Sequence, residues 1–299
     1  MEVSKAEIIF KKKFYLCRPM KNNWLLAILA VVFVSFTSCK SEFERIRSSG
    51  DVKAIYDQAE KYFEEEEYQK AQTLYELIIG SYRGQKEAEN IYYKYAYTYY
   101  NLGRYILAAY YFKNFANTYS ASDYREEADF MSAFSYYQLS PNFRLDQSYT
   151  EKAIDDFQLF VNTYPQSERV TRCNRLIDEM RLKLEKKALE SARLYFDLRQ
   201  YQAATQSFEN LLKDFPETAN IEEIRYMIIR SSFELAENSV VDKQEERYTN
   251  VLRETSEFIR RYSNSRYIKE IRSFEKKSQS KLKNIKNVRY QDSSSGIGS

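Results

Sequence analysis

Histidine is absent from this chain of 299 residues, cysteine occurs three times, and only six glycines are present. Without histidine the chain lacks the commonest general base and the commonest transition-metal ligand. So few cysteines also argue against zinc, haem and Cys–His nucleophilic chemistry. The sequence contains no glycine-rich phosphate loop. We therefore predict that the protein is not an enzyme and has no catalytic residue, no cofactor and no metal site.

The charge balance gives no sign of a nucleic-acid partner. The formal net charge is +3, and part of it comes from a basic stretch at the N-terminus. The remainder is near neutral, whereas phosphate binding requires a clear basic excess. Four prolines and six glycines favour a chain that is mostly helix with short turns. Cys173 lies within a helical pattern, and we interpret it as a small buried residue.

The N-terminal region has the layout of a secretory signal peptide. A basic stretch precedes an apolar run of about 13 residues, 24–36, and two small residues follow. Cys39 comes directly after them, where a bacterial lipobox carries its acylated cysteine, although Phe36 stands where lipoboxes usually have leucine. The alternative is an uncleaved signal anchor, but the run is shorter than the ~20 residues that a membrane-spanning helix needs.

This layout divides the N-terminal region into two parts. We predict a signal peptide over residues 1–38, with Met20 as an alternative translation start, because Met20 begins a compact basic segment by itself. Lipidation is predicted at Cys39, and residues 39–50 are predicted to form a lipidated tether.

Small and aromatic residues recur along the rest of the chain, which contains 28 tyrosines. Alanines that follow an aromatic residue by three or four positions are Ala71, Ala108, Ala153 and Ala204. The aromatic residues four positions further on are Tyr75, Phe112, Phe157 and Phe208, and a second set of alanines precedes the first at Ala59, Ala96, Ala133 and Ala192. This is the tetratricopeptide pattern, in which two helices cross closely where small residues meet. The fold class predicted is all-α, a tetratricopeptide-repeat superhelix of about five helix-turn-helix units; the alternative is a non-repeating helical bundle.

The turns between units support this register. Hydroxyl residues follow the last aromatic of the later units at Ser122, Ser167, Thr218 and Ser265, and we predict that they are N-caps of the next helix. Residues 167–198 contain no helix breaker, so a long helix is predicted there, linking the first three units to the last two. Residues 284–299 end in a Ser- and Gly-rich stretch and are predicted to be a disordered tail.

The order of these features resembles the BamD family, the lipoproteins of the outer-membrane β-barrel assembly machinery. The features are the lipobox Cys39, about five tetratricopeptide units, an insertion around Pro141 in the third unit, and the long helix. The resemblance implies a lipid-anchored scaffold on the periplasmic face of the outer membrane, with a BamA-like protein and unfolded β-barrel precursors as partners. It also implies that residues 51–166, units one to three, are the substrate-side half. Residues 167–283, the long helix and units four and five, would then be the partner-side half.

The first helices of units one to three carry aromatic residues that we predict to line a peptide groove. These candidates are Tyr56, Phe63, Tyr93, Tyr97, Tyr100, Phe130, Phe134 and Tyr137. Aromatic rings supply a large contact area for an extended, aromatic-rich precursor segment. The alternative is that these rings pack between successive units.

Two other functions are kept as alternatives. One is a different envelope tetratricopeptide lipoprotein that acts as a protein-interaction adaptor. The other is a glycan-binding lipoprotein, which is disfavoured because the single tryptophan lies in the signal peptide and glycan sites favour tryptophan platforms.

Overall fold

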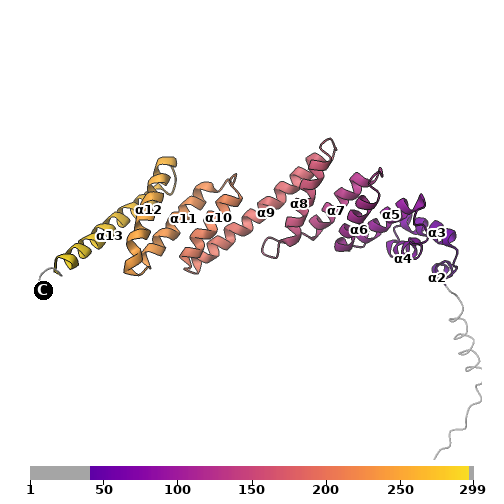
Figure 1. Cartoon of the computed structure of the whole chain (residues 1–299), viewed down its shortest axis with the longest axis horizontal. Helices are drawn as coiled ribbons and strands as arrows, with labels where there is room; N and C mark the ends of the chain where they lie inside the picture. The colour runs from indigo at the N-terminus through magenta and orange to yellow at the C-terminus, as the bar shows by residue number, and fades with distance from the viewer. Residues whose placement is uncertain (1–40, 296–299) are drawn as a thin grey trace, which may run out of the picture.

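The computed structural model describes residues 41–295, and the side chains of residues 41–287. Within that part every regular element is an α-helix, and successive helices pack side by side in an elongated row (Figure 1). Cys39 and the predicted signal peptide over residues 1–38 lie outside the described residues.

The helices pair into five units, with one helix before them and one after them. They are α2 (Glu42–Arg47); α3 (Val52–Glu64) and α4 (Tyr68–Ile78) in unit one; α5 (Glu87–Asn101) and α6 (Tyr105–Thr118) in unit two; α7 (Arg125–Leu139) and α8 (Ser148–Thr163) in unit three; α9 (Val170–Asp197) and α10 (Tyr201–Asp214) in unit four; α11 (Ile221–Glu237) and α12 (Val241–Arg261) in unit five; and α13 (Ile268–Ser295).

Small residues occupy the helix crossings, as the repeat pattern predicts. Eight alanines have no exposed surface: Ala59, Ala71, Ala96, Ala108, Ala133, Ala153, Ala192 and Ala204. The large residues four positions after the second-helix alanines, Tyr75, Phe112, Phe157 and Phe208, are equally buried. A methyl group at each crossing lets the two backbones approach, and the large rings fill the space beside it. The all-α tetratricopeptide register is therefore confirmed.

The hydroxyl residues in the turns connect each turn to the first helix of the unit before it. Each hydroxyl oxygen accepts a hydrogen bond, at 3.0 to 3.1 Å, from the backbone amide two residues further on. That amide belongs to the residue just before the first residue of the next helix. They are therefore turn residues ahead of the helix and not its N-caps, which corrects the prediction. Each hydroxyl also donates to a glutamate on the first helix of its own unit, in the pairs Ser122–Glu89, Ser167–Glu126, Thr218–Glu185 and Ser265–Glu222. These bonds tie the end of units two to five to the beginning of the same unit.

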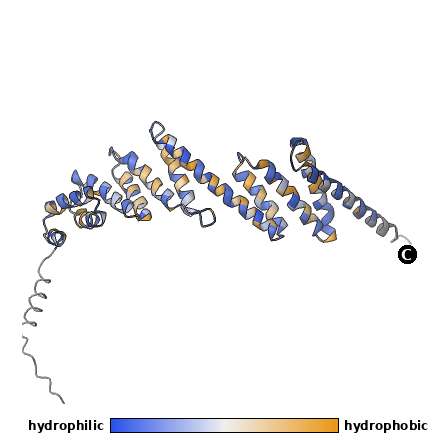
Figure 2. Ribbon diagram, turned by 180° about the vertical axis from the view of Figure 1, so that it is seen from behind, coloured by the Kyte–Doolittle hydropathy of each residue, from blue (hydrophilic) through white to orange (hydrophobic). Residues whose placement is uncertain are grey.

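The long helix α9 joins two separate hydrophobic cores. Its first half contributes residues up to Met180 to the core of units one to three, and its second half contributes residues from Leu189 to the core of units four and five. Between them Leu182 is 65% exposed. The predicted linking helix is confirmed, and it is hydrophilic over much of its surface (Figure 2).

The insertion in unit three rests on α9. Lys187 donates to the backbone oxygen of Leu145 at 2.5 Å, and Lys183 donates to Ser140 at 2.7 Å. The insertion is therefore held between the third unit and the long helix.

Helix α13 closes the second core and corrects the prediction of a disordered tail from residue 284. Phe274 stacks on Phe233 at 4.7 Å, and Leu282 and Ile285 pack against the same core. The helix continues to Ser295, since no glycine or proline interrupts it before Gly296. The Ser- and Gly-rich composition that predicts disorder applies only to the last residues of the segment.

The predicted tether over residues 39–50 is also partly folded. Ser41 caps α2 by accepting from the amide of Glu44, and Phe43 packs edge-to-face on Tyr62 at 6.0 Å. Because α2 packs against unit one, little free chain separates Cys39 from the first unit.

Candidate protein-interaction surface

The first helices of successive units form one continuous face. Lys94 of α5 pairs with Glu60 of α3 at 2.5 Å, and Tyr97 of α5 donates to Glu127 of α7. Tyr137 of α7 in turn donates to Glu179 of α9 at 3.1 Å. Contacts between first helices therefore run without a break from unit one to unit four.

Seven of the eight predicted groove residues lie half-buried in this face. They are Tyr56, Phe63, Tyr93, Tyr97, Tyr100, Phe134 and Tyr137, and we refer to them as the aromatic face. Each ring packs against the first core and keeps part of its surface accessible. Packing of these rings against the first core is therefore observed, and their lining of a peptide groove stays a prediction.

Phe130 is the exception and is a core residue. Its side chain is only 3% exposed, and its ring lies 5.9 Å from Phe157 and 5.8 Å from Phe160. Arg169 and Arg172 cover its outer side at 5.4 and 5.1 Å. The prediction that Phe130 is open to a peptide is therefore wrong, because the next unit supplies side chains that close over it.

The tyrosines of α5 are held by rings and hydrogen bonds from units two and three. Tyr93 stacks on Tyr124 at 4.5 Å, and Tyr97 packs edge-to-face on Phe112 at 4.9 Å. Burial raises the pKa of Tyr93 to about 12, and burial together with the bond to Glu127 raises the pKa of Tyr97 further. Both hydroxyls therefore stay protonated at neutral pH and act as hydrogen-bond donors or acceptors without charge.

A stack of three rings continues the face into unit three. Tyr100 lies 6.2 Å from Phe134, and Phe134 lies 5.6 Å from Tyr137, with the ring planes close to parallel in both pairs. The guanidinium of Arg172 sits 4.7 Å from the centre of the Phe134 ring. This arrangement offers ring surfaces next to a cation, which suits contact with aromatic side chains.

In unit one a polar cluster separates the two predicted residues. Tyr56 accepts from Asn90 at 3.1 Å, and Lys94 lies 5.2 Å above the ring of Phe63. Glu60 lies between them and accepts from Tyr75 at 2.6 Å as well as from Lys94. This end of the face is therefore more polar than the part on units two and three.

Several residues of this surface were not singled out from the sequence. Tyr124 is 43% exposed and lies beside Tyr93, and the guanidinium of Arg172 covers Phe134. Tyr124 lies in the turn between units, where the helical period used to choose candidates does not apply. Tyr124 follows Ser122 by two positions, and Arg169 follows Ser167 by the same spacing. This spacing could have identified Tyr124 as a surface candidate.

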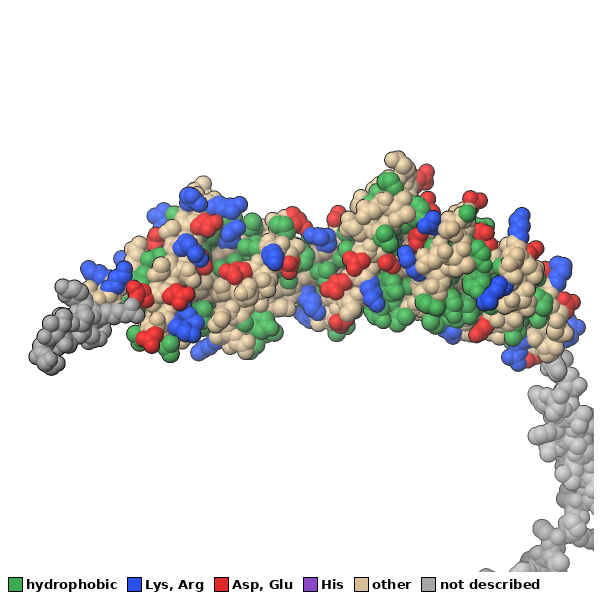
Figure 3. All heavy atoms as spheres, viewed as in Figure 1, with side chains coloured by type: hydrophobic (Ala, Val, Ile, Leu, Met, Phe, Trp, Pro, Cys, Tyr) green, Lys and Arg blue, Asp and Glu red, His purple; other side chains and the backbone are tan. Residues whose placement is uncertain are grey.

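Charged clusters, the thiol of Cys173 and the hydropathy of the helices also characterise the described residues. Within residues 41–287 no group of three or more His, Cys, Asp or Glu side chains is placed to hold a metal ion. Positive and negative side chains are interspersed along the face of the molecule shown in Figure 3.

Burial raises the pKa of the Cys173 thiol to about 11, and its side chain is fully buried, so Cys173 is a packing residue as predicted. None of the described helices is long and apolar enough to cross a membrane.

The fold defines the class of protein: a tetratricopeptide-repeat solenoid built of five helix pairs. The chain belongs to the YfiO family of outer membrane lipoproteins, whose profile matches residues 48–223. A relative in Rickettsia prowazekii (strain Madrid E), the outer membrane protein assembly factor BamD, is 23% identical over 233 residues, which are 78% of this chain and 91% of the relative. The resemblance to the BamD family is thereby confirmed.

Two solved structures are also similar to this chain. The TPR2AB domain of yeast Sti1, in a complex with pHSP90, has a TM-score of 0.37 and 14% identity, covering 78% of this chain and 100% of that one. The apo form of RapI has a TM-score of 0.30 and 12% identity, covering 78% of this chain and 99% of that one.

Proposed function

We propose that this protein is a lipid-anchored scaffold of the outer-membrane β-barrel assembly machinery on the periplasmic face of the membrane. Its C-terminal half would bind a BamA-like barrel protein, and its aromatic face would bind unfolded barrel precursors. Family membership supports a role in outer membrane assembly. The proposal that precursors bind here rests on one observation, the row of half-buried rings on the first helices of units one to three.

The position of α2 supports a short anchor. If Cys39 is acylated, only Lys40 and Ser41 separate it from α2, which begins at Glu42. Three residue steps span at most about 11 Å of extended chain. Unit one, against which α2 packs, would therefore lie close to the membrane surface, where precursors arrive for insertion.

The aromatic face is suited to an extended, aromatic-rich segment. Tyr100, Phe134 and Tyr137 form a stack of rings, and Arg172 adds a cation at its side. A peptide ring can insert against such a stack in an offset or edge-to-face geometry, and each such contact contributes ~0.5–1.5 kcal/mol beyond its buried area.

The burial of the rings decides which variant can test binding of a precursor to the aromatic face. Tyr93 and Tyr97 pack on the rings of Phe115 and Phe112, so their replacement by serine would cost folding stability as well as binding. We therefore choose Tyr100→Ser combined with Tyr137→Ser. A matched control is Tyr110→Ser combined with Tyr195→Ser, whose rings are 57% and 40% exposed and lie outside the aromatic face.

The test measures the affinity of the lipoprotein for a C-terminal barrel-precursor peptide by fluorescence anisotropy. We expect the Tyr100/Tyr137 variant to bind about 10- to 100-fold more weakly, a loss of about 1.4 to 2.7 kcal/mol, and the control variant to bind normally. Unchanged affinity in a folded Tyr100/Tyr137 variant would refute substrate binding on this face. The triple change of Tyr93, Tyr97 and Tyr100 to serine is expected to weaken binding too, but with a lowered melting temperature.

Partner binding is tested separately by purifying the intact lipoprotein from membranes. Stoichiometric recovery of a BamA-like barrel protein is expected. Recovery of a different envelope protein in its place would favour the alternative, an adaptor of the same family fold with another task.

A further inference from the structure

The turns within the units and the turns between units lie at opposite edges of the row of helices. Successive helices run in opposite directions, so every turn inside a unit faces one long edge and every turn between units faces the other. The turns inside the units lie along the lower edge in Figure 1. We call this the turn edge, and its turns are residues 65–67, 102–104, 140–147, 198–200 and 238–240.

Exposed apolar side chains gather at the turn edge. In units two to five, large apolar residues that are 44 to 68% exposed lie in these turns or within the three residues after them: Ile106, Leu107, Leu145, Leu198, Val240 and Val241. In the described part of the chain, the turns between units contribute only Tyr124 to the exposed large apolar residues. Apolar residues scattered singly are normal on a protein surface, but their alignment on one edge in four successive units indicates a shared contact.

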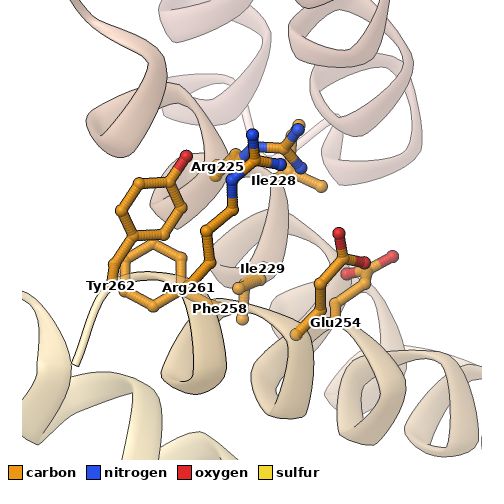
Figure 4. Close-up of a pocket in the computed structure, with 8 residues that line it drawn as sticks. Arg225, Ile228, Ile229, Glu254, Phe258, Arg261 and Tyr262 are labelled. Atoms are coloured by element: carbon orange, nitrogen blue, oxygen red, sulfur yellow. The ribbon is translucent and has the colours of Figure 1, made fainter.

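Other apolar residues of unit five are covered by charged side chains. Between α11 and α12, Arg225 and Arg261 line the same small pocket as Phe258, and Phe258 is buried (Figure 4). By contrast, no side chain covers most of the surface of Val240 and Val241 at the turn of the same unit. Apolar exposure in unit five is therefore concentrated at the turn edge.

Each apolar tip has a basic residue beside it. Exposed cations stand within two positions of the apolar residues in each of these four turns: Arg104, Arg144, Arg199 and Lys243. Three exposed aspartates, Asp146, Asp197 and Asp242, offset most of this charge, so the edge is close to neutral. Apolar side chains flanked by Lys or Arg suit the interface of a bilayer, where the apolar group enters the lipid and the cation stays among the headgroups.

The start of the described chain lies at the same edge. Phe43 of α2 packs on Tyr62, two residues before the end of α3, and Lys70 near the start of α4 lies 5.1 Å from the centre of the same ring. Helix α2 is therefore beside the turn of unit one, at the lower edge in Figure 1. An acylated Cys39 would hold this edge, and not the opposite one, against the membrane.

We propose that the turn edge of units two to five rests on the membrane that holds the anchor, with its apolar tips inserted at the lipid interface. The tips are spread along the length of the molecule, and a flat bilayer can contact all of them at once. Unit one, whose turn carries exposed glutamates at positions 64–67, would be held by the anchor alone. This inference rests on the lipid anchor of the proposed function and adds a second contact with the same membrane.

Tryptophan fluorescence can test this contact. Trp24 lies in the predicted signal peptide, so a tryptophan introduced into the mature lipoprotein would report on its own surroundings. The test compares Leu145→Trp and Leu198→Trp with two controls, Leu77→Trp and Leu159→Trp. The control leucines are 52% and 50% exposed, but they lie in the second halves of α4 and α8, towards the other edge. Each purified lipoprotein is reconstituted into vesicles of phosphatidylethanolamine and phosphatidylglycerol, with or without brominated acyl chains, and its melting temperature is measured.

We expect the emission at positions 145 and 198 to shift to the blue in vesicles and to lose about half or more of its intensity to brominated lipid, because the ring lies at the acyl boundary. The emission at positions 77 and 159 should be unaffected by bromination. Equal quenching at all four positions, or no quenching at 145 and 198, would overturn the proposal. A blue shift at 145 and 198 without quenching would mean that protein, such as a second copy of the chain, covers the edge, and would overturn it as well.

Palmitate labelling separates this inference from the anchor on which it rests. Label taken up by the parent protein, with no quenching at positions 145 and 198, would refute the turn-edge contact and leave the anchor standing. Quenching at these positions without any label would refute the anchor and support the turn-edge contact, since the tips would then bind lipid unaided.

Discussion

Replacing Ala204 by leucine tests the helix crossing on which the fold depends. Ala204 has no exposed surface and stands four residues before the buried ring of Phe208. Leucine adds three carbon atoms where only a methyl group fits, so neighbouring side chains or the backbone must shift. Overpacking of this kind costs about 1–3 kcal/mol. For a chain of this size each kcal/mol lowers the melting temperature by roughly 2–4 °C, so a fall of about 2–12 °C is expected.

The adjacent Ala203 provides a matched control. It lies in the same helix, is only half-buried, and borders an open pocket between α10 and α11. Alanine and leucine have similar helix propensities, so Ala203→Leu should change stability by no more than about 0.5 kcal/mol. The difference between the two variants therefore isolates the crossing.

Hydrogen exchange locates the effect. Helix α9 contributes residues to both cores, and in a repeat solenoid each unit is stabilised chiefly by its neighbours. Ala204→Leu should reduce amide protection in α10 to α12 and leave α5 to α7 unchanged, whereas Ala108→Leu should do the reverse. Equal melting temperatures for Ala204→Leu and Ala203→Leu would refute the assignment of Ala204 to a close helix crossing.

Two further predictions concern the anchor and the alkaline limit of stability. Cys39→Ser should abolish incorporation of labelled palmitate, and label retained in this variant would disprove the lipobox. Burial and a hydrogen bond to Glu270 raise the pKa of Tyr226 to about 12, while the unfolded chain loses this proton near pH 10. Folding stability should therefore fall as the pH rises from about 10 towards 12, and denaturant titrations should show a smaller fall in Tyr226→Phe.

The chain of residues by itself determined the repeat. Small residues at fixed spacing are compatible with only one kind of contact, a close helix crossing, and all eight alanines chosen for this reason are buried. The long helix was equally predictable, since an uninterrupted run of helix formers from residue 167 leaves the backbone no place to turn. Such features depend on local periodicity, which is visible in one dimension.

Tertiary structure decided which aromatic rings remain accessible. Phe130 and Phe134 share one face of α7 and are indistinguishable by helical spacing, yet Phe130 is 3% exposed and Phe134 is half-buried. The difference arises because Phe130 also packs against two rings of α8, and Arg169 of the next unit covers it, whereas Arg172 lies over both rings. Burial at such a position depends on side chains 27 to 39 residues away in the sequence, and the period of a single helix carries no information about them.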